Sequence, residues 1–158
     1  MAALAGTAGG RVESTGRVEG EVAPLPADSV DLYLNGSEKF PPLLAEMASA
    51  KRYIHVMYLE WDRDALTAQV TEVRLERLKE DVQVHILYDW LTCVVFKKDE
   101  LKRLASAGAV VAACYKRLPQ MNYRNHRKMA IIDGKSGKSV YSGGMNMAQK
   151  LHRRRTAL

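Results

Sequence analysis

Apolar and polar residues follow two different periods along most of this chain. Five short segments are continuously apolar or alternate with a period of two, which is typical of β-strands. The expected strands are residues 53–61, 82–90, 109–115, 128–132 and 139–142. The first two carry apolar side chains in both directions, as in strands that are buried on both faces. The short Gly-containing loop over 133–138 makes the last pair antiparallel.

Two of the intervening segments show helical spacing. Residues 64–80 begin at Asp64, a suitable cap, and the inward positions include Leu66, Val70, Val73 and Arg77, with Arg74 on the solvated side. A shorter helix is expected to begin at an Asp99 cap and to end at Gly108. Strands that alternate with helices predict an α/β sandwich with a parallel or mixed sheet.

The N-terminal third is less regular. Residues 1–28 are rich in Ala, Gly, Val and Glu without a period, and we expect a disordered extension. The alternation of Val30, Leu32 and Leu34 predicts a short strand before the Asn35-Gly36 turn. Pro41 and Pro42 are then expected in the first turn of a helix that runs to about Ala50.

Composition and charge narrow the class of protein. The chain has 158 residues, of which 47% are apolar and 27% charged, which suits one folded domain. Residues 1–110 contain 13 basic and 17 acidic residues, whereas residues 111–158 contain 11 basic residues and only Asp133 as an acid. The positive end predicts an anionic partner, either nucleic acid, phospholipid headgroups or a phosphorylated substrate, although a solvated basic tail explains the charge equally well.

Targeting and cysteine signals are sparse. No run approaches 18 apolar residues, and the N-terminus has no basic residue before Arg11, so neither a membrane-spanning helix nor a signal peptide is expected. Cys93 and Cys114 lie 21 positions apart and fit neither a zinc ribbon nor a redox pair. We expect two buried thiols in a reducing compartment.

The densest group of chemically useful residues lies between 122 and 146. His126 and Lys128 are two positions apart on an extended segment, so their side chains are expected on one face, and Asp133 lies at the far end of the same strand. After the next strand, Gly143-Gly144 allows backbone N–H groups to approach a ligand, and Asn146 offers an amide at an expected helix start. This combination predicts a phosphate site with a nucleophilic histidine.

Three other polar residues lie on or at the ends of apolar strands. His55 and His85 are expected to be packed and hydrogen bonded, and His55 could also line the phosphate site from a neighbouring strand. Asp89 ends its strand where parallel sheets often carry function, although a capping or turn role fits equally well.

The segment NYRNHRKMAIIDG, followed by GGMN, resembles the HKD motif of the phospholipase D superfamily, and YLNGSEKFPPLLAEMASAKRYIHVMYLEW and ILYDW resemble the first half of bacterial cardiolipin synthases. The resemblance covers residues 30–149 and implies a phospholipase-D-like α-β-α sandwich that is incomplete at its C-terminal end. The implied domains are an extension at 1–28, a phospholipase-D-like domain at 29–149 and a basic tail at 150–158.

The resemblance also implies roles. One histidine of such an enzyme forms a phosphohistidine, and a histidine from a second HKD motif protonates the leaving alcohol, without a metal or other cofactor. His126 is then either the nucleophile or the acid that assists it. The residues implied to bind phosphate are Lys128, Asn146, Gly143 and Gly144. Asp133 is implied to orient the site. Expected partners are an anionic phospholipid such as phosphatidylglycerol, the cytoplasmic face of a membrane in a peripheral attachment, and a second half-site from a homodimer or a C-terminal half.

Two alternatives remain open because the chain carries a single HKD motif. One is a single-motif phosphodiesterase or nuclease that completes its site by forming a homodimer. The other is a non-catalytic fragment that binds anionic lipid or nucleic acid through its positive end, with binding that weakens steeply as salt rises.

Overall fold

The computed structural model describes residues 27–58, 64–90, 98–114, 125–135 and 137–147. The chain divides into two units after Asp31, and the strands and helices of the described residues belong to the unit that begins at Leu32. The expected extension at 1–28 and basic tail at 150–158 lie almost wholly outside the described residues.

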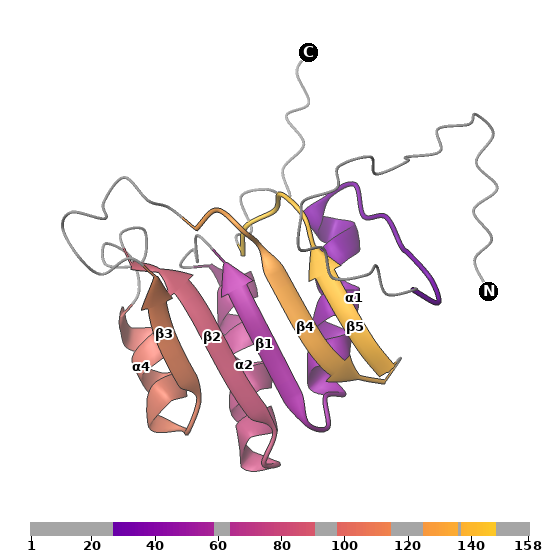
Figure 1. The fold of residues 1–158 in the computed structure, drawn as a ribbon. Helices are drawn as coiled ribbons and strands as arrows, with labels where there is room; N and C mark the ends of the chain where they lie inside the picture. Colours follow the sequence, from indigo (N-terminus) through magenta and orange to yellow (C-terminus); the bar gives the residue numbers. More distant parts are fainter. Residues whose placement is uncertain (1–26, 59–63, 91–97, 115–124, 136, 148–158) are drawn as a thin grey trace, which may run out of the picture. The chain divides into compact units, whose positions relative to one another are not determined.

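Five strands form one mixed sheet in the order β3-β2-β1-β4-β5 (Figure 1). Parallel pairing joins β1 to β2 and β2 to β3, whereas β4 is antiparallel to both β1 and β5. The strands are β1 (Tyr53–Tyr58), β2 (Gln83–Asp89), β3 (Val110–Cys114), β4 (Met129–Gly134) and β5 (Gly137–Ser142). The mixed sheet and the antiparallel final pair confirm the predicted α/β class.

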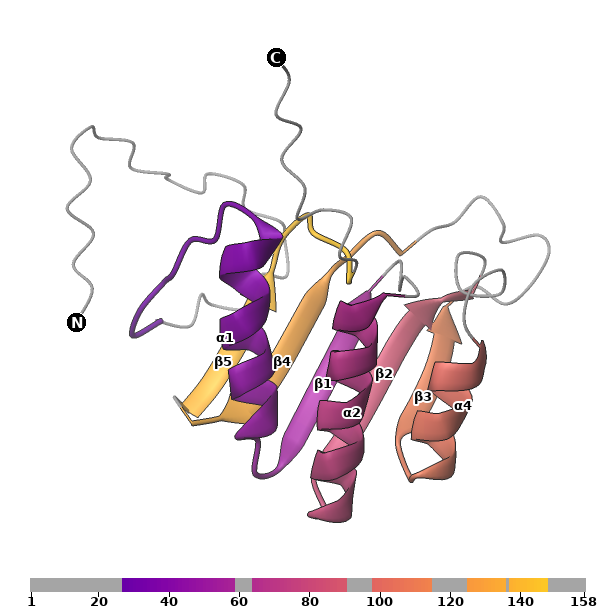
Figure 2. The ribbon, with the colours of Figure 1, turned by 180° about the vertical axis from the view of Figure 1, so that it is seen from behind.

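The helices of the described residues cover one face of this sheet, as the view from behind shows (Figure 2). They are α1 (Gly36–Ala48), α2 (Ala65–Lys79) and α4 (Lys98–Ser106). The core lies between the helices and the sheet, and its fully buried side chains include Leu43, Met47, Ile54, Val70 and Ile132. Every second residue of the central strands therefore points toward the helices.

The opposite face of the sheet carries none of these three helices (Figures 1 and 2). The strand register aligns one row across all five strands, Val140–Ile131–His55–His85–Val110. The two outer valines are 62% and 57% exposed, and the two imidazole rings in the middle stack with their centroids 4.6 Å apart. A shallow pocket of about 380 Å³ lies over this open face.

The N-terminal part departs from the sequence expectation in two ways. Val30, Leu32 and Leu34 form no strand and are 72–79% exposed, so the predicted alternation there was wrong. Helix α1 begins earlier than expected because the Asn35 side chain accepts a hydrogen bond from the Glu38 amide at 3.1 Å. Pro41 and Pro42 therefore lie inside the helix and not in its first turn.

Helix α2 confirms the predicted Asp64 cap, whose side chain accepts from the Thr67 amide at 2.9 Å. The prediction that Arg74 faces solvent was wrong, since this residue is fully buried. Leu66, Val70 and Arg74 are four residues apart and so share one face. In α4, Asp99 lies within the first turn and is not the cap, and Gly108 follows the helix with φ of +103°.

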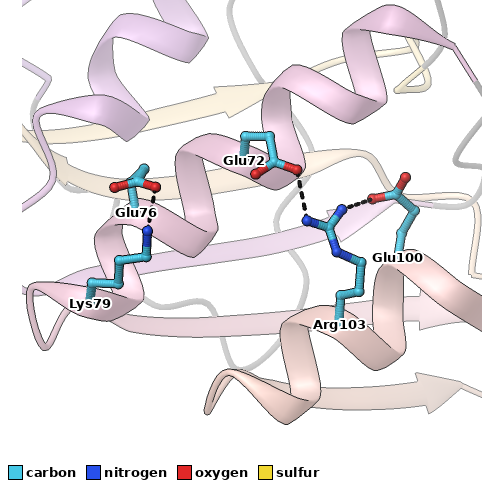
Figure 3. Close-up of polar contacts among 5 residues, drawn as sticks. All are labelled: Glu72, Glu76, Lys79, Glu100 and Arg103. Carbon is cyan, nitrogen blue, oxygen red and sulfur yellow. Dashed lines mark hydrogen bonds and ion pairs between the residues drawn. The ribbon is translucent and has the colours of Figure 1, made fainter.

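Ion pairs connect the outer surfaces of α2 and α4 (Figure 3). Arg103 lies 2.9 Å from Glu72 and 3.9 Å from Glu100, and Lys79 pairs with Glu76 within α2. Most of these side chains are more than half exposed, so water screens the pairs and each contributes little to stability. The apolar core, and not these pairs, holds the helices on the sheet.

Candidate active site

The strand pairing brings two loops to one edge of the sheet. Met129, the first residue of β4, pairs with Met57 near the end of β1 and with Ser142 at the end of β5. The segment that precedes β4 and the segment that follows β5 therefore lie at the edge where the parallel strands end, the upper edge in Figure 1. We call this edge, with residues 125–128 and 143–147, the reactive edge.

His126 and Lys128 differ in exposure although they are two positions apart. The His126 side chain is exposed, whereas Lys128 is only 3% exposed. The Lys128 ammonium donates a hydrogen bond of 2.7 Å to the main-chain carbonyl of His126. Lys128 thus fixes the backbone that carries the histidine, and the imidazole remains accessible to a ligand.

The glycine turn lies at the same edge. Gly143 has φ of +150°, which favours glycine, and a Cβ at Gly143 or Gly144 would meet nothing within 4 Å. Asn146 is half-buried, and its neighbour Met147 is fully buried with its carbonyl 3.4 Å from the Thr67 hydroxyl of α2. The helix expected from Asn146 onward falls largely on residues after 147, outside the described residues.

Asp133 is placed at the opposite end of β4. It lies four residues beyond Met129, about 13 Å along the strand. Its carboxylate pairs with the Arg52 guanidinium, and its carbonyl accepts from the Lys51 amide at 3.0 Å. The structure therefore brings His126, Lys128, the glycines and Asn146 together but does not bring Asp133 to them.

Asn125, immediately before His126, is a residue of the reactive edge that the sequence reasoning did not single out. Its amide nitrogen Nδ2 lies 3.1 Å from Met57 Sδ and 3.5 Å from Cys114 Sγ, and its main-chain N–H donates to Asp89 Oδ2 at 3.3 Å. These partners end or nearly end β1, β2 and β3. The position beside the motif was the only available signal, because the partners are far away in sequence.

Two buried cations lie beneath the reactive edge near Tyr58, the last residue of β1. The Lys39 ammonium lies 5.6 Å from the ring centroids of Tyr58 and Phe40, and burial lowers the Lys39 pKa. Burial raises the pKa of Tyr58 to about 12, although the nearby positive charge of Arg74 acts to lower it. Burial also lowers the pKa of Arg74 to about 9. Lys39 of α1 and Arg74 of α2 therefore both lie near the Tyr58 side chain.

The described residues contain no cluster of three or more His, Cys, Asp or Glu side chains that could hold a metal ion. Among the same residues, no helix is both long and apolar enough to cross a membrane. Neither His126 nor Lys128 lines the pocket over the open face, which is bordered by Met57, Leu87, Ala112 and Met129 among others.

Residues 43–156 match a family model described as cardiolipin synthase, phospholipase-D-like domain. The chain is 38% identical over 128 residues to the major cardiolipin synthase of Bacillus subtilis and 35% identical over 127 residues to a cardiolipin synthase of Oceanobacillus iheyensis. Each alignment covers 78% of this chain but 26% of the relative, so the chain spans about a quarter of the length of these curated proteins.

Two solved structures share the fold. Nuc of Salmonella typhimurium, a phospholipase D family member, superposes with a TM-score of 0.53 at 18% identity over 70% of this chain and 66% of Nuc. NucT of Helicobacter pylori gives 0.51 at 16% identity over 70% of this chain and 68% of NucT. Likeness at these identities shows the fold alone.

Proposed function

Because this chain belongs to the cardiolipin synthase family of phospholipase-D-like domains, we propose that it supplies one half-site for phosphodiester transfer through a phosphohistidine. The observation that carries the proposal is the exposed His126 at the reactive edge, beside the buried Lys128 and the Gly143–Asn146 turn. The reaction that fits best is phosphatidyl transfer between two phosphatidylglycerol molecules, which releases glycerol.

The reaction requires two histidines, and His126 is one of them. An imidazole nitrogen attacks phosphorus, so that an N–P bond forms while the P–O bond to the first alcohol breaks. The second histidine donates a proton to that departing oxygen. It then takes the proton of the second alcohol, whose oxygen attacks phosphorus and releases the imidazole. His126 acts as the nucleophile or as the acid and base.

The other motif residues divide into two groups in this proposal. Lys128, the Gly143 and Gly144 amides and the Asn146 side chain stabilise the negative charge on the phosphoryl oxygens, because all of them lie at the reactive edge. Asp133 acts at a distance by holding the lower end of β4 through Arg52. No step requires a metal or another cofactor.

The second half-site comes from a second copy of this chain or from a continuation of the same polypeptide. Relatives about three times as long as this chain support such a continuation. The anionic lipid is presented at a membrane surface, which we place at the cytoplasmic face. The positive charge of residues 111–158 supports peripheral attachment, with each basic residue near an anionic bilayer contributing on the order of 1 kcal/mol.

The decisive experiment compares His126→Ala with Lys135→Ala on phosphatidylglycerol vesicles. His126→Ala is expected to reduce cardiolipin formation by roughly a thousandfold or more, since it removes the group that bonds to phosphorus. Lys135 is exposed beyond the opposite end of β4, far from the reactive edge that meets the lipid, so in this proposal its charge does not contact the bilayer and its replacement should leave the rate within about twofold. Mass spectrometry of the lipids measures the product, and full turnover by His126→Ala contradicts the proposal.

The same assay separates the two alternatives. Hydrolysis of a simple phosphodiester by a dimer, without cardiolipin formation, favours the single-motif phosphodiesterase. Vesicle binding that weakens steeply between two salt concentrations, with no product at any protein concentration, favours a non-catalytic fragment. Light scattering on the same samples gives the oligomeric state.

A further inference from the structure

The segment that carries His126 lies outside the regular sheet. Residues 125–128 precede β4 and do not take part in its ladder of hydrogen bonds. The backbone of His126 must therefore be held by other contacts on each side. Lys128 provides one of them through its 2.7 Å bond to the His126 carbonyl, and Asn125 provides the others.

Asn125 connects the histidine to three strands at once. Its Nδ2 group contacts sulfur atoms of Met57 and Cys114, which are weak acceptors. Its main-chain N–H donates to the Asp89 carboxylate, which is a stronger acceptor because it carries charge. Asp89 therefore makes the strongest of the three links to Asn125.

Asp89 is well placed to transmit rigidity. It is 2% exposed and ends β2, where the ladder pairs it with Cys114 of β3 and pairs the preceding residue, Tyr88, with Tyr58 of β1. Its position is thus fixed by the centre of the sheet. One peptide bond separates the amide that it binds from the residue that carries the imidazole.

We propose that Asp89 is a positioning residue, which holds His126 in the reactive geometry through the Asn125 amide. The inference rests on the proposed function, since it gives Asp89 a role in the reaction of His126. Without the carboxylate, the Asn125 N–H loses its acceptor and the backbone before His126 is freed on one side. A misplacement of about 1 Å can lower a rate by about a hundredfold.

The test uses Asp89→Ala and Asp89→Asn in the full chain. Asp89→Ala is expected to lower kcat about 10- to 100-fold while KM changes less than about threefold, because the loss concerns alignment and not lipid binding. Asp89→Asn keeps an oxygen that can accept the hydrogen bond and should recover most of the rate. Unchanged kcat in Asp89→Ala overturns the inference.

Gly134→Ala is the matched control for a purely structural effect. A Cβ at Gly134 would lie 3.0 Å from the Glu46 carbonyl, so this variant should also lose stability, but at the opposite edge from His126. Its kcat per folded molecule is expected to stay within about twofold of the wild type. An equal fall of kcat in Gly134→Ala and Asp89→Ala overturns a specific role for Asp89.

A measurement without substrate keeps this inference separate from the proposed function. Amide hydrogen exchange at Asn125 should accelerate about 10- to 100-fold in Asp89→Ala, while exchange in β1 and β4 changes little. If Asp89→Ala does not fold, Asp89→Asn should still accelerate exchange at Asn125 a few-fold. If exchange at Asn125 is faster in the variant but the wild type shows no turnover, only the proposed function is contradicted. If exchange at Asn125 is unchanged in the variant, the positioning role of Asp89 is contradicted.

Discussion

Asp133 and His126 belong to one motif but lie at the two ends of β4, so their replacements should have different effects. Asp133→Ala removes a carboxylate that is 11% exposed and paired with Arg52, and it should lower the free energy of unfolding by about 1–3 kcal/mol. Because the reactive edge is remote, kcat per folded molecule should stay within about threefold. Urea unfolding combined with the lipid assay measures both quantities.

Arg52→Ala is the control for that pair. The Arg52 side chain is 67% exposed, so its loss leaves a carboxylate that water can reach in part and should cost less than Asp133→Ala. A fall of kcat in Asp133→Ala comparable to that in His126→Ala would instead place the carboxylate in the chemistry.

At the scale of elements, the sequence predicted the helix caps and strand ends that depend on neighbouring residues. The Asp64 cap and the strands ending at Asp89 and Ser142 follow from residues that are neighbours in sequence. The inward position of Arg74 does not, because it depends on Tyr58 and Glu100, which other elements bring close. The same holds at the candidate site. The motif identified His126, but the contacts of Asn125 with Asp89 and Met57 could not be predicted because these residues meet only in the folded sheet.

The stacked histidines of two strands, His55 in β1 and His85 in β2, should make the free energy of unfolding depend on pH. Burial, and to a lesser degree the neighbouring His85, lowers the pKa of His55. The unfolded chain then binds a proton near the ordinary value of about 6.5, while the folded chain binds it only at lower pH. Stability is therefore complete above pH 6.5 and should decrease as the pH falls from there toward the lowered pKa of His55.

Urea unfolding at several pH values between 7.5 and 5 measures this effect. His55→Gln removes the titrating group and should flatten the pH dependence relative to the wild type. His85→Phe keeps a ring beside His55 but removes the charge, so it should reduce the slope without abolishing it. Parallel curves for the wild type and His55→Gln would contradict this assignment.

At the scale of the whole molecule, the two faces of the sheet should respond differently to substitution. Ile132 is fully buried under the helices, and Ile132→Ala should cost about 2–5 kcal/mol through lost contacts and a cavity. Val140, 62% exposed on the open face, should tolerate Val140→Thr within about 0.5 kcal/mol. Urea unfolding at two protein concentrations measures both variants. A loss above about 1 kcal/mol for Val140→Thr would mean that the open face is covered in solution. If that loss grows with protein concentration, the cover is a second copy of the chain.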